Sequence, residues 1–191
     1  DRAHLLSAHA VELFLDAEVG AFRQAAENTF GLIVRPIEAE DSATPSAQSV
    51  LLEVLLRLMP LVGAPAFQKV ASDVLSRHAA ALSEANLAFS SLALAADLLG
   101  DGPVELALVP GTGDDAEVMG WLAAVGETYQ PTLVTKVVHP GDTSPIALGR
   151  GPVSGSITAY ICRMRTCSAP IDSLYGVLGG AWLGHRTRCM R

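Results

Sequence analysis

Two cysteines in the last part of the chain lie close together in the sequence and could carry thiol chemistry. Cys162 and Cys167 are separated by four residues, of which Arg163 and Arg165 are cationic. Neighbouring cations lower the pKa of a thiol, so the pair permits a reactive thiol or a reversible disulfide. The spacing differs from the C-x-x-C of thioredoxin-type enzymes, and buried cysteines are mostly inert. A structural role for this candidate thiol pair is therefore favoured, with redox chemistry as an alternative.

A second alternative for the same pair is a metal site. His185 and Cys189 follow with an H-x3-C spacing, and together with Cys162 and Cys167 they make a possible set of tetrahedral zinc ligands. The length of chain between the two halves suits a small zinc module only loosely. No metal and no other cofactor is therefore predicted.

A glycine-rich turn follows the first β-prone run. Residues 111–116 read Gly-Thr-Gly-Asp-Asp-Ala, which matches the dinucleotide fingerprint G-x-G-x-x-G/A at a strand-to-helix junction. Asp114 and Asp115 would lie where the pyrophosphate must bind, and their negative charge opposes that ligand. The same two residues are good helix N-caps. A capped turn is therefore favoured over nucleotide binding.

The other polar residues do not form a catalytic set by their spacing. Glu38, Glu40 and Asp41 form an acidic cluster that could supply a carboxylate pair for glycoside chemistry, and a solvated loop is the favoured interpretation. The five histidines are dispersed along the chain, so no Ser/His/Asp or Cys/His arrangement is predicted.

The composition excludes several classes of protein. Half of the 191 residues are hydrophobic and 17% are charged, which rules out disorder as the main state. The 20 acidic and 13 basic residues give a net charge of −7, the wrong sign for a partner of nucleic acid. The longest uncharged apolar stretches are about 12 residues, short of the roughly 20 of a transmembrane helix, so a soluble protein is expected.

The cysteine count and the start of the chain bear on the compartment. Three cysteines are too few for a secreted disulfide framework, so an intracellular reducing compartment is expected. The chain begins at Asp1 and shows no signal-peptide pattern. A removed transit peptide fits this start, as does an incompletely known sequence, and an organelle such as the mitochondrion is the expected location.

The first hundred residues are predicted to be helical. Helices are expected over 2–16, 47–62, 65–82 and 86–99, the second with Ser46 as its N-cap and Gly63 as its stop. Residues 31–46 are expected to form a long loop. The short links between the later helices describe helical hairpins packed side by side.

Residues 101–191 have a different pattern. β-prone runs at 104–109 and 132–138 flank a helical stretch at 114–128, which predicts a βαβ unit with a parallel pair of strands. A Gly/Pro-rich stretch over 140–155 precedes a third strand at 156–162 and a last helix at 171–183. Two regions are therefore expected, a helical one over 1–100 and a small α/β one over 101–191.

Three segments, in this order, carry a family resemblance. The first reads Leu-Ile-Val-Arg-Pro over 32–36 and Asp-Ser-Ala-Thr-Pro-Ser-Ala-Gln-Ser-Val over 41–50. The second is the run 104–109 with its following helix and strand, and the third reads Thr-Ala-Tyr-Ile-Cys-Arg over 158–163 and Thr-Cys-Ser-Ala-Pro over 166–170. Together they resemble the spermatogenesis-associated, thioredoxin-domain-containing family, whose bacterial members are of the YyaL type. Gln48 stands where the family signature P-S-x-N-S has asparagine.

The resemblance implies a place near the C-terminal end of a longer protein. Family members have a thioredoxin-like domain, then an α/α toroid related to sugar epimerases and six-hairpin glycosidases, then a small α/β element. This chain corresponds to the last toroid helices and the α/β element. The residues that would line a candidate cleft are Arg35, Asp41, Ser46 and Gln48, and the resemblance makes Cys162 and Cys167 a thiol pair.

The fold class expected from all this is mixed α+β, with helical hairpins from an incomplete α/α toroid followed by a small βαβ parallel-sheet element. An incomplete toroid leaves the apolar stripes at 50–59 and 67–82 short of partners, and exposed stripes mark interfaces. The leading expectation is a non-catalytic structural or accessory subunit that packs with protein partners in a larger assembly. The alternative is the C-terminal fragment of a thioredoxin-domain-containing redox or carbohydrate-processing enzyme.

Overall fold

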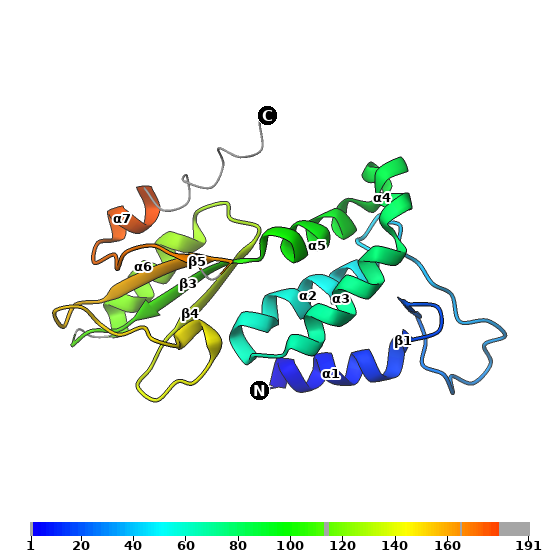
Figure 1. The fold of residues 1–191 in the computed structure, drawn as a ribbon, viewed down its shortest axis with the longest axis horizontal. Helices are drawn as coiled ribbons and strands as arrows, with labels where there is room; N and C mark the ends of the chain where they lie inside the picture. The colour runs from blue at the N-terminus through cyan, green and yellow to red at the C-terminus, as the bar shows by residue number, and fades with distance from the viewer. Residues whose placement is uncertain (1, 113–114, 165, 180–191) are drawn as a thin grey trace. The chain divides into compact units, whose positions relative to one another are not determined.

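The fold combines helices with a mixed sheet. The computed structural model describes residues 2–112, 115–164 and 166–179 of the 191-residue chain. Within these residues it contains seven α-helices and a four-stranded sheet, so the predicted mixed α+β class is confirmed. No helix in this part of the chain is long and apolar enough to cross a membrane. The chain divides into two compact units, Asp1–Gly102 and Pro103–Arg191 (Figure 1).

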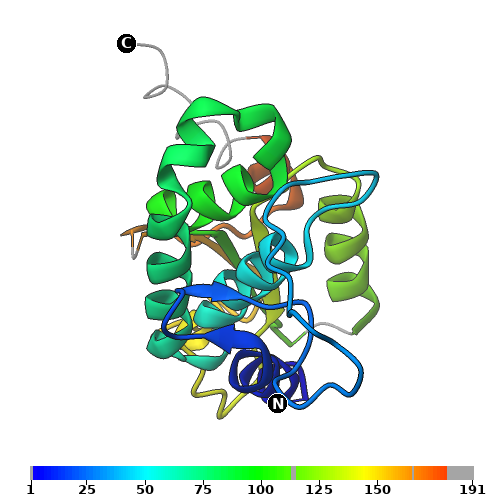
Figure 2. The ribbon, with the colours of Figure 1, turned by 90° about the vertical axis from the view of Figure 1, so that its right-hand side faces the viewer.

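The first unit consists of helices and one small hairpin. Its elements are α1 (Arg2–Phe14), β1 (Leu15–Asp16), β2 (Ala21–Phe22), α2 (Ala47–Val62), α3 (Pro65–Arg77), α4 (Ala79–Glu84), the 3₁₀-helix η1 (Asn86–Phe89) and α5 (Ser90–Asp101). β1 and β2 pair antiparallel. The segment 23–46, which joins β2 to α2, contains no helix or strand, so the loop predicted over 31–46 is confirmed (Figure 2).

Local signals in the sequence explain the ends of α2. The Ser46 hydroxyl accepts a hydrogen bond from the backbone N–H of Ser49 at 3.2 Å, which caps the first turn. Gly63 ends the helix in the left-handed conformation, with φ 68°, which glycine adopts without a steric penalty. The predicted start, end and caps of this helix are confirmed.

The neighbouring helices differ from the prediction at their ends. The helix predicted over 65–82 is interrupted at His78, whose φ of −100° and ψ of 7° separate α3 from α4. The His78 ring makes a hydrogen bond to α2, which hydrophobic periodicity cannot reveal. The helix predicted over 86–99 starts as a 3₁₀-helix, and the one predicted over 2–16 ends at Phe14, where β1 begins.

The core of the first unit lies between α2, α3 and α5. Its fully buried side chains include Leu52, Leu55, Val74, Leu92 and Leu98. The apolar stripes of α2 and α3 are therefore largely covered within this unit, although Val50 and Val54 stay exposed.

The second unit is a sheet with helices on one face. Its elements are β3 (Val104–Val109), α6 (Asp115–Gly126), β4 (Leu133–Val137), the 3₁₀-helix η2 (Pro145–Ala147), β5 (Thr158–Arg163), β6 (Thr166–Cys167) and α7 (Leu174–Gly179). The strand order is β4-β3-β5-β6. β3 and β4 are parallel, which confirms the predicted βαβ unit, whereas β5 runs antiparallel to both β3 and β6.

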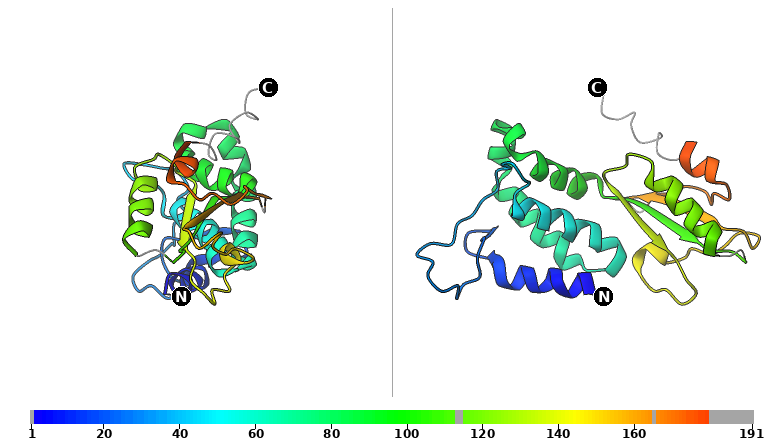
Figure 3. Two further views of the ribbon diagram at one scale, coloured as in Figure 1. Left: turned by 90° about the vertical axis from the view of Figure 1, so that its left-hand side faces the viewer. Right: turned by 180° about the vertical axis from the view of Figure 1, so that it is seen from behind.

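The two faces of the sheet have different covers. Leu106, Leu108, Ala159 and Ile161 point to the face that packs against α6 and α7 (Figures 1 and 3). Because side chains alternate along a strand, Glu105, Ala107, Tyr160 and Cys162 lie on the other face. The segment 139–156, which contains η2, lies on that second face, since the Tyr160 hydroxyl donates to the Gly151 carbonyl at 2.7 Å.

Candidate functional site

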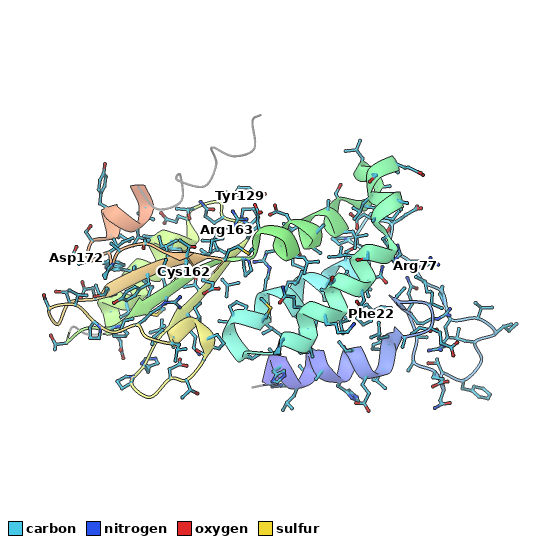
Figure 4. The ribbon with its side chains drawn as sticks, viewed as in Figure 1. Phe22, Arg77, Tyr129, Cys162, Arg163 and Asp172 are labelled. Atoms are coloured by element: carbon cyan, nitrogen blue, oxygen red, sulfur yellow. A yellow bond between two sulfur atoms is a disulfide. The ribbon has the colours of Figure 1, made fainter. Side chains whose placement is uncertain are left out.

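The two cysteines singled out in the sequence form a disulfide across the β5–β6 hairpin. Cys162 and Cys167 are direct cross-strand partners, with Cα atoms 4.0 Å apart. Cys162, labelled in Figure 4, is 1% exposed, whereas Cys167 lies exposed on the edge strand of the sheet. One sulfur is therefore open to a partner molecule and the other is sheltered.

The hairpin that aligns the cysteines is set by a tight turn. Arg163 pairs with Thr166, so only positions 164 and 165 connect the strands. Met164 has φ 50°, the sign that two-residue hairpin turns require. The sequence carries no signal for β6, because a strand of two residues gives no alternation of polar and apolar residues.

The cation beside the sulfurs is Arg150. Its Nη2 lies 2.8 Å from Cys162 Sγ and 3.4 Å from Cys167 Sγ, and its Nη1 donates to the Ile146 carbonyl. The sequence suggested Arg163 and Arg165 for this role. Arg163 follows Cys162 directly in the strand and so points to the opposite face of the sheet, and Arg165 lies outside the described residues. Nothing in the local sequence indicated Arg150.

A carboxyl group completes this cluster. Glu105 is the cross-strand partner of Cys162, and its Oε2 lies 3.6 Å from Arg150 Nη2. Burial raises the pKa of Glu105, and the Arg150 charge and hydrogen bond only partly oppose that effect. The side chains of Glu105 and Arg150 are 20% and 10% exposed, so their ion pair is well shielded from water. Glu105, Arg150, Cys162 and Cys167 are called the sulfur cluster below.

Two members of the zinc alternative, Cys162 and Cys167, are joined to each other in this arrangement. A sulfur held in a disulfide offers no thiolate to a metal, so Cys162 and Cys167 cannot act as ligands in this state. His185 and Cys189, the other members of the set, lie outside the described residues. Among the residues that are described, no group of three or more His, Cys, Asp and Glu side chains could hold a metal ion.

Two of the four candidate cleft residues, Asp41 and Ser46, are in direct contact. One Asp41 oxygen accepts a hydrogen bond from the Ser46 N–H at 3.0 Å, and the other accepts from the Ser91 N–H at 2.7 Å. Buried Gln48 accepts from the Phe22 N–H at 2.8 Å. These contacts attach the 23–46 loop and the β1–β2 hairpin to α2 and α5. The side chains of Asp41 and Gln48 therefore act here by holding the backbone of these segments in place.

Arg35 differs from the other candidate cleft residues. Its carbonyl oxygen accepts a hydrogen bond from Arg23 Nη1 at 2.7 Å. No described contact joins its side chain to Asp41, Ser46 or Gln48. The contact of Arg35 with Arg23 fixes the course of the 23–46 loop.

A cavity of about 610 Å³ lies beside Asp41. Its lining includes the acidic cluster of Glu38, Glu40 and Asp41 together with His78 and Phe89. Burial, together with the charge of Arg77, lowers the pKa of His78. For Asp41, burial acts to raise the pKa, but the hydrogen bonds from Ser91 and Ser46 prevail and the pKa is lowered. Both Asp41 oxygens accept hydrogen bonds from backbone N–H groups, those of Ser46 and Ser91.

The glycine-rich turn after β3 has a packing role. A Cβ on Gly111 would lie 2.1 Å from the Gly155 carbonyl oxygen and 2.5 Å from the carbonyl carbon of Ser156. The first glycine of the fingerprint is thus needed because another part of the backbone passes beside it. Gly113 and Asp114 lie outside the described residues, and α6 begins at Asp115.

Compared with known proteins, the chain matches no protein-family model and no curated protein. The mixed α+β class and the sulfur cluster are therefore the observations from which its function has to be inferred.

Proposed function

We propose that the second unit is a thiol–disulfide redox element that exchanges two electrons with a dithiol or disulfide partner. The observation that carries this proposal is the asymmetry of the disulfide, which joins an exposed Cys167 to a buried Cys162. The Cys162 sulfur accepts a hydrogen bond from the Arg150 guanidinium. The sequence leaves a structural role, redox chemistry and a metal site open for this pair, and this arrangement favours redox chemistry.

The short sequence separation of the two cysteines argues against a purely stabilising role for the disulfide. The two cysteines are only five positions apart. Closing so short a ring stabilises the folded state by about 2 kcal/mol, the low end for a disulfide. The β5–β6 ladder pairs both residues directly opposite each other, so we expect the S–S bond to open and close without unfolding of the unit.

The exchange follows from which sulfur is accessible. A partner thiolate attacks Cys167 Sγ, the S–S bond breaks, and Cys162 Sγ leaves with the electron pair as a thiolate beside the Arg150 guanidinium. A second thiol of the partner then attacks the mixed disulfide and releases Cys167 as a thiolate. The partner dithiol is oxidised to a disulfide, and the protein cystine is reduced by the same two electrons.

Two further considerations support the proposal. The expected compartment is reducing, where disulfides are mostly transient and catalytic. The resemblance to the thioredoxin-domain-containing family places a C-x4-C pair at this position of the family ending. In that context the chain would be the C-terminal part of a larger redox protein, and its helical unit the last hairpins of an α/α toroid.

The test is to trap the mixed disulfide. All variants carry Cys189→Ser, which leaves only the two cysteines of the sulfur cluster. On mixing with oxidised glutathione, we expect Cys162→Ser to accumulate a mixed disulfide at Cys167 with release of one reduced glutathione, whereas Cys167→Ser forms one roughly 100-fold more slowly because Cys162 is buried. Intact-mass analysis after acid quenching measures both.

The unsubstituted pair provides the control for trapping. With both Cys162 and Cys167 present, a buffer of reduced and oxidised glutathione should cycle the protein reversibly between two thiols and a disulfide without a stable adduct. A disulfide that opens only in denaturant, or equal trapping at both cysteines, would contradict a redox role.

A second candidate function, the structural or accessory subunit, is favoured by a different observation. α1 buries only Ser7 among its described side chains, while Leu5 and Leu6 are 69% and 61% exposed. The loop residues Phe30 and Ile33 are fully exposed as well. Apolar side chains presented in this way are typical of a surface that a protein partner covers.

Native mass spectrometry of the protein isolated from its source tests this candidate. We expect the chain to be found in a heteromeric assembly that dissociates when Leu5 and Leu6 are both replaced by glutamate. The matched control, Glu12→Lys, changes an exposed charged position of the same helix and should leave the assembly intact. A chain that is monomeric in its source would exclude a subunit role.

A further inference from the structure

We infer that Glu105 is the proton acceptor for the Cys162 thiol, so that the step closing the disulfide is driven by a carboxylate of the neighbouring strand. The inference rests on the proposed redox function and adds to it a group that accepts the proton. Neither the cysteine spacing nor the family resemblance indicates this residue.

The geometry places Glu105 next to the reacting sulfur. Glu105 on β3 and Cys162 on β5 are direct partners in the antiparallel ladder, and they share the face covered by the segment 139–156. The Cβ atoms of such partners lie about 5 Å apart, so a rotation of the Glu105 side chain brings its carboxyl to Sγ. Arg150 already joins the two groups, because its Nη2 lies 3.6 Å from Glu105 Oε2 and 2.8 Å from Cys162 Sγ.

The charges of the cluster change when the disulfide is reduced. In the oxidised state Arg150 faces one anion, the Glu105 carboxylate. Reduction adds a second anion, the Cys162 thiolate, in a sheltered place with one cation for both. Burial already raises the pKa of Glu105, so a proton bound at this cluster relieves the excess negative charge. Reduction of the cystine is therefore coupled to uptake of a proton.

Other titratable or charged side chains on this face are few. β4 contributes Lys136, which forms an ion pair with Asp142 at 2.8 Å. β5 contributes Tyr160, whose hydroxyl is bonded to Gly151, and β6 contributes Cys167. Among the described residues, Arg150 forms an ion pair with Glu105, while Lys136 donates hydrogen bonds to Asp142 and Ser144.

The disulfide closes from the mixed disulfide with the partner. A mixed disulfide joins Cys167 to the partner, and Cys162 is a thiol. The Glu105 carboxylate takes the proton from Cys162 Sγ, and the thiolate attacks Cys167 Sγ. The bond between Cys167 and the partner sulfur breaks, and the partner leaves as a thiolate with the electron pair. The protein dithiol has been oxidised, the partner disulfide has been reduced, and Glu105 releases its proton to water.

Stopped-flow reaction of the reduced protein with dithiobis(nitrobenzoate) separates the two steps, because each releases one coloured thiolate. All proteins carry Cys189→Ser. The first phase, attack by Cys167, depends on the concentration of reagent, and the second, attack by Cys162, does not. We expect Glu105→Gln to leave the first phase unchanged and to slow the second about tenfold or more near pH 7. Its pH profile should lose the inflection that the carboxyl produces.

The direction of the change distinguishes a proton acceptor from a charged neighbour. A carboxylate that only competes for Arg150 would disfavour the Cys162 thiolate, so Glu105→Gln would then accelerate the second phase. Glu105→Asp, which keeps the carboxyl, should retain the pH inflection and provides the same readout should the glutamine variant not fold. The matched control is Glu127→Gln, the same change at an exposed position of this unit.

The outcomes separate the two proposals. A second phase that is unchanged or faster in Glu105→Gln overturns the role of Glu105 and leaves the redox function intact. If the reduced Cys189→Ser chain with Glu105 in place shows no first phase, it has no reactive Cys167, and both proposals then fall. A slow second phase with a lost inflection, rescued in part by Glu105→Asp, supports both.

Discussion

Replacing Arg150 with methionine is expected to slow reduction of the Cys162–Cys167 disulfide by dithiothreitol about tenfold at neutral pH. The leaving sulfur, Cys162 Sγ, loses its hydrogen bond from Arg150 Nη2, which lies 2.8 Å away, so the thiolate formed at Cys162 is less stable. The same substitution leaves the Glu105 carboxyl without its cation in a largely buried site. Breaking a shielded ion pair in this way lowers the free energy of unfolding by about 3 kcal/mol.

The measurements are the rate of thiol appearance and urea unfolding of the full chain. Lys136→Met is the matched control, because it removes one cation from the same face of the sheet and breaks an ion pair that does not touch sulfur. This control should lower stability without changing the rate of reduction. Equal rates of reduction in wild type and Arg150→Met would mean that the guanidinium does not act on the sulfur.

Gly111→Ala is expected to have the second large effect, a loss of about 3 kcal/mol or more of stability in the second unit. The added methyl group would lie 2.1 Å from the Gly155 oxygen, and backbone atoms cannot move aside as a flexible side chain can. The turn after β3 would have to separate from the segment 155–156, and the hydrogen bond from Thr112 N–H to the Gly155 carbonyl would break.

Gly120→Ala is the matched control for Gly111→Ala. Gly120 lies in α6, and a Cβ there would meet nothing within 4 Å, so alanine should stabilise the helix by up to about 1 kcal/mol. Fluorescence of buried Trp121 reports unfolding of this unit when Trp182 is replaced by phenylalanine. Equal midpoints of urea unfolding for both glycine variants would contradict the close approach at Gly111.

Gly111 also shows why a short motif needs its structural context. The fingerprint at 111–116 matches a dinucleotide site in its spacing, but the charges of its two aspartates oppose that ligand. The glycine is required all the same, because the backbone of Gly155 and Ser156 comes from a segment more than forty residues later. No local pattern carries that information.

Much of the fold could be predicted because its signals are local. The caps of α2 at Ser46 and Gly63 depend on one or two residues, and the run at 104–109 is long and apolar enough to be a buried strand. The break at His78 and the two-residue strand β6 could not be predicted, since the His78 ring makes its hydrogen bond to Gln48, 30 positions away in the chain, and β6 has no periodicity.

The candidate site was predictable only in part for the same reason. Sequence alone identified Cys162 and Cys167 as a pair, because five positions in one hairpin are within local reach. It attributed the cation to the adjacent arginines, whereas strand alternation turns Arg163 away and the segment 139–156 supplies Arg150.

What the sequence by itself determined is the mixed composition of helices and strands, the change of character near residue 101 and the presence of two nearby thiols. Only the tertiary structure decided which groups face those thiols. The register that sets Glu105 opposite Cys162 and the loop that carries Arg150 join residues 12 to 57 positions apart. Such contacts form because burying the sheet fixes its strand pairing, and pairing of distant strands leaves no periodic pattern in the chain.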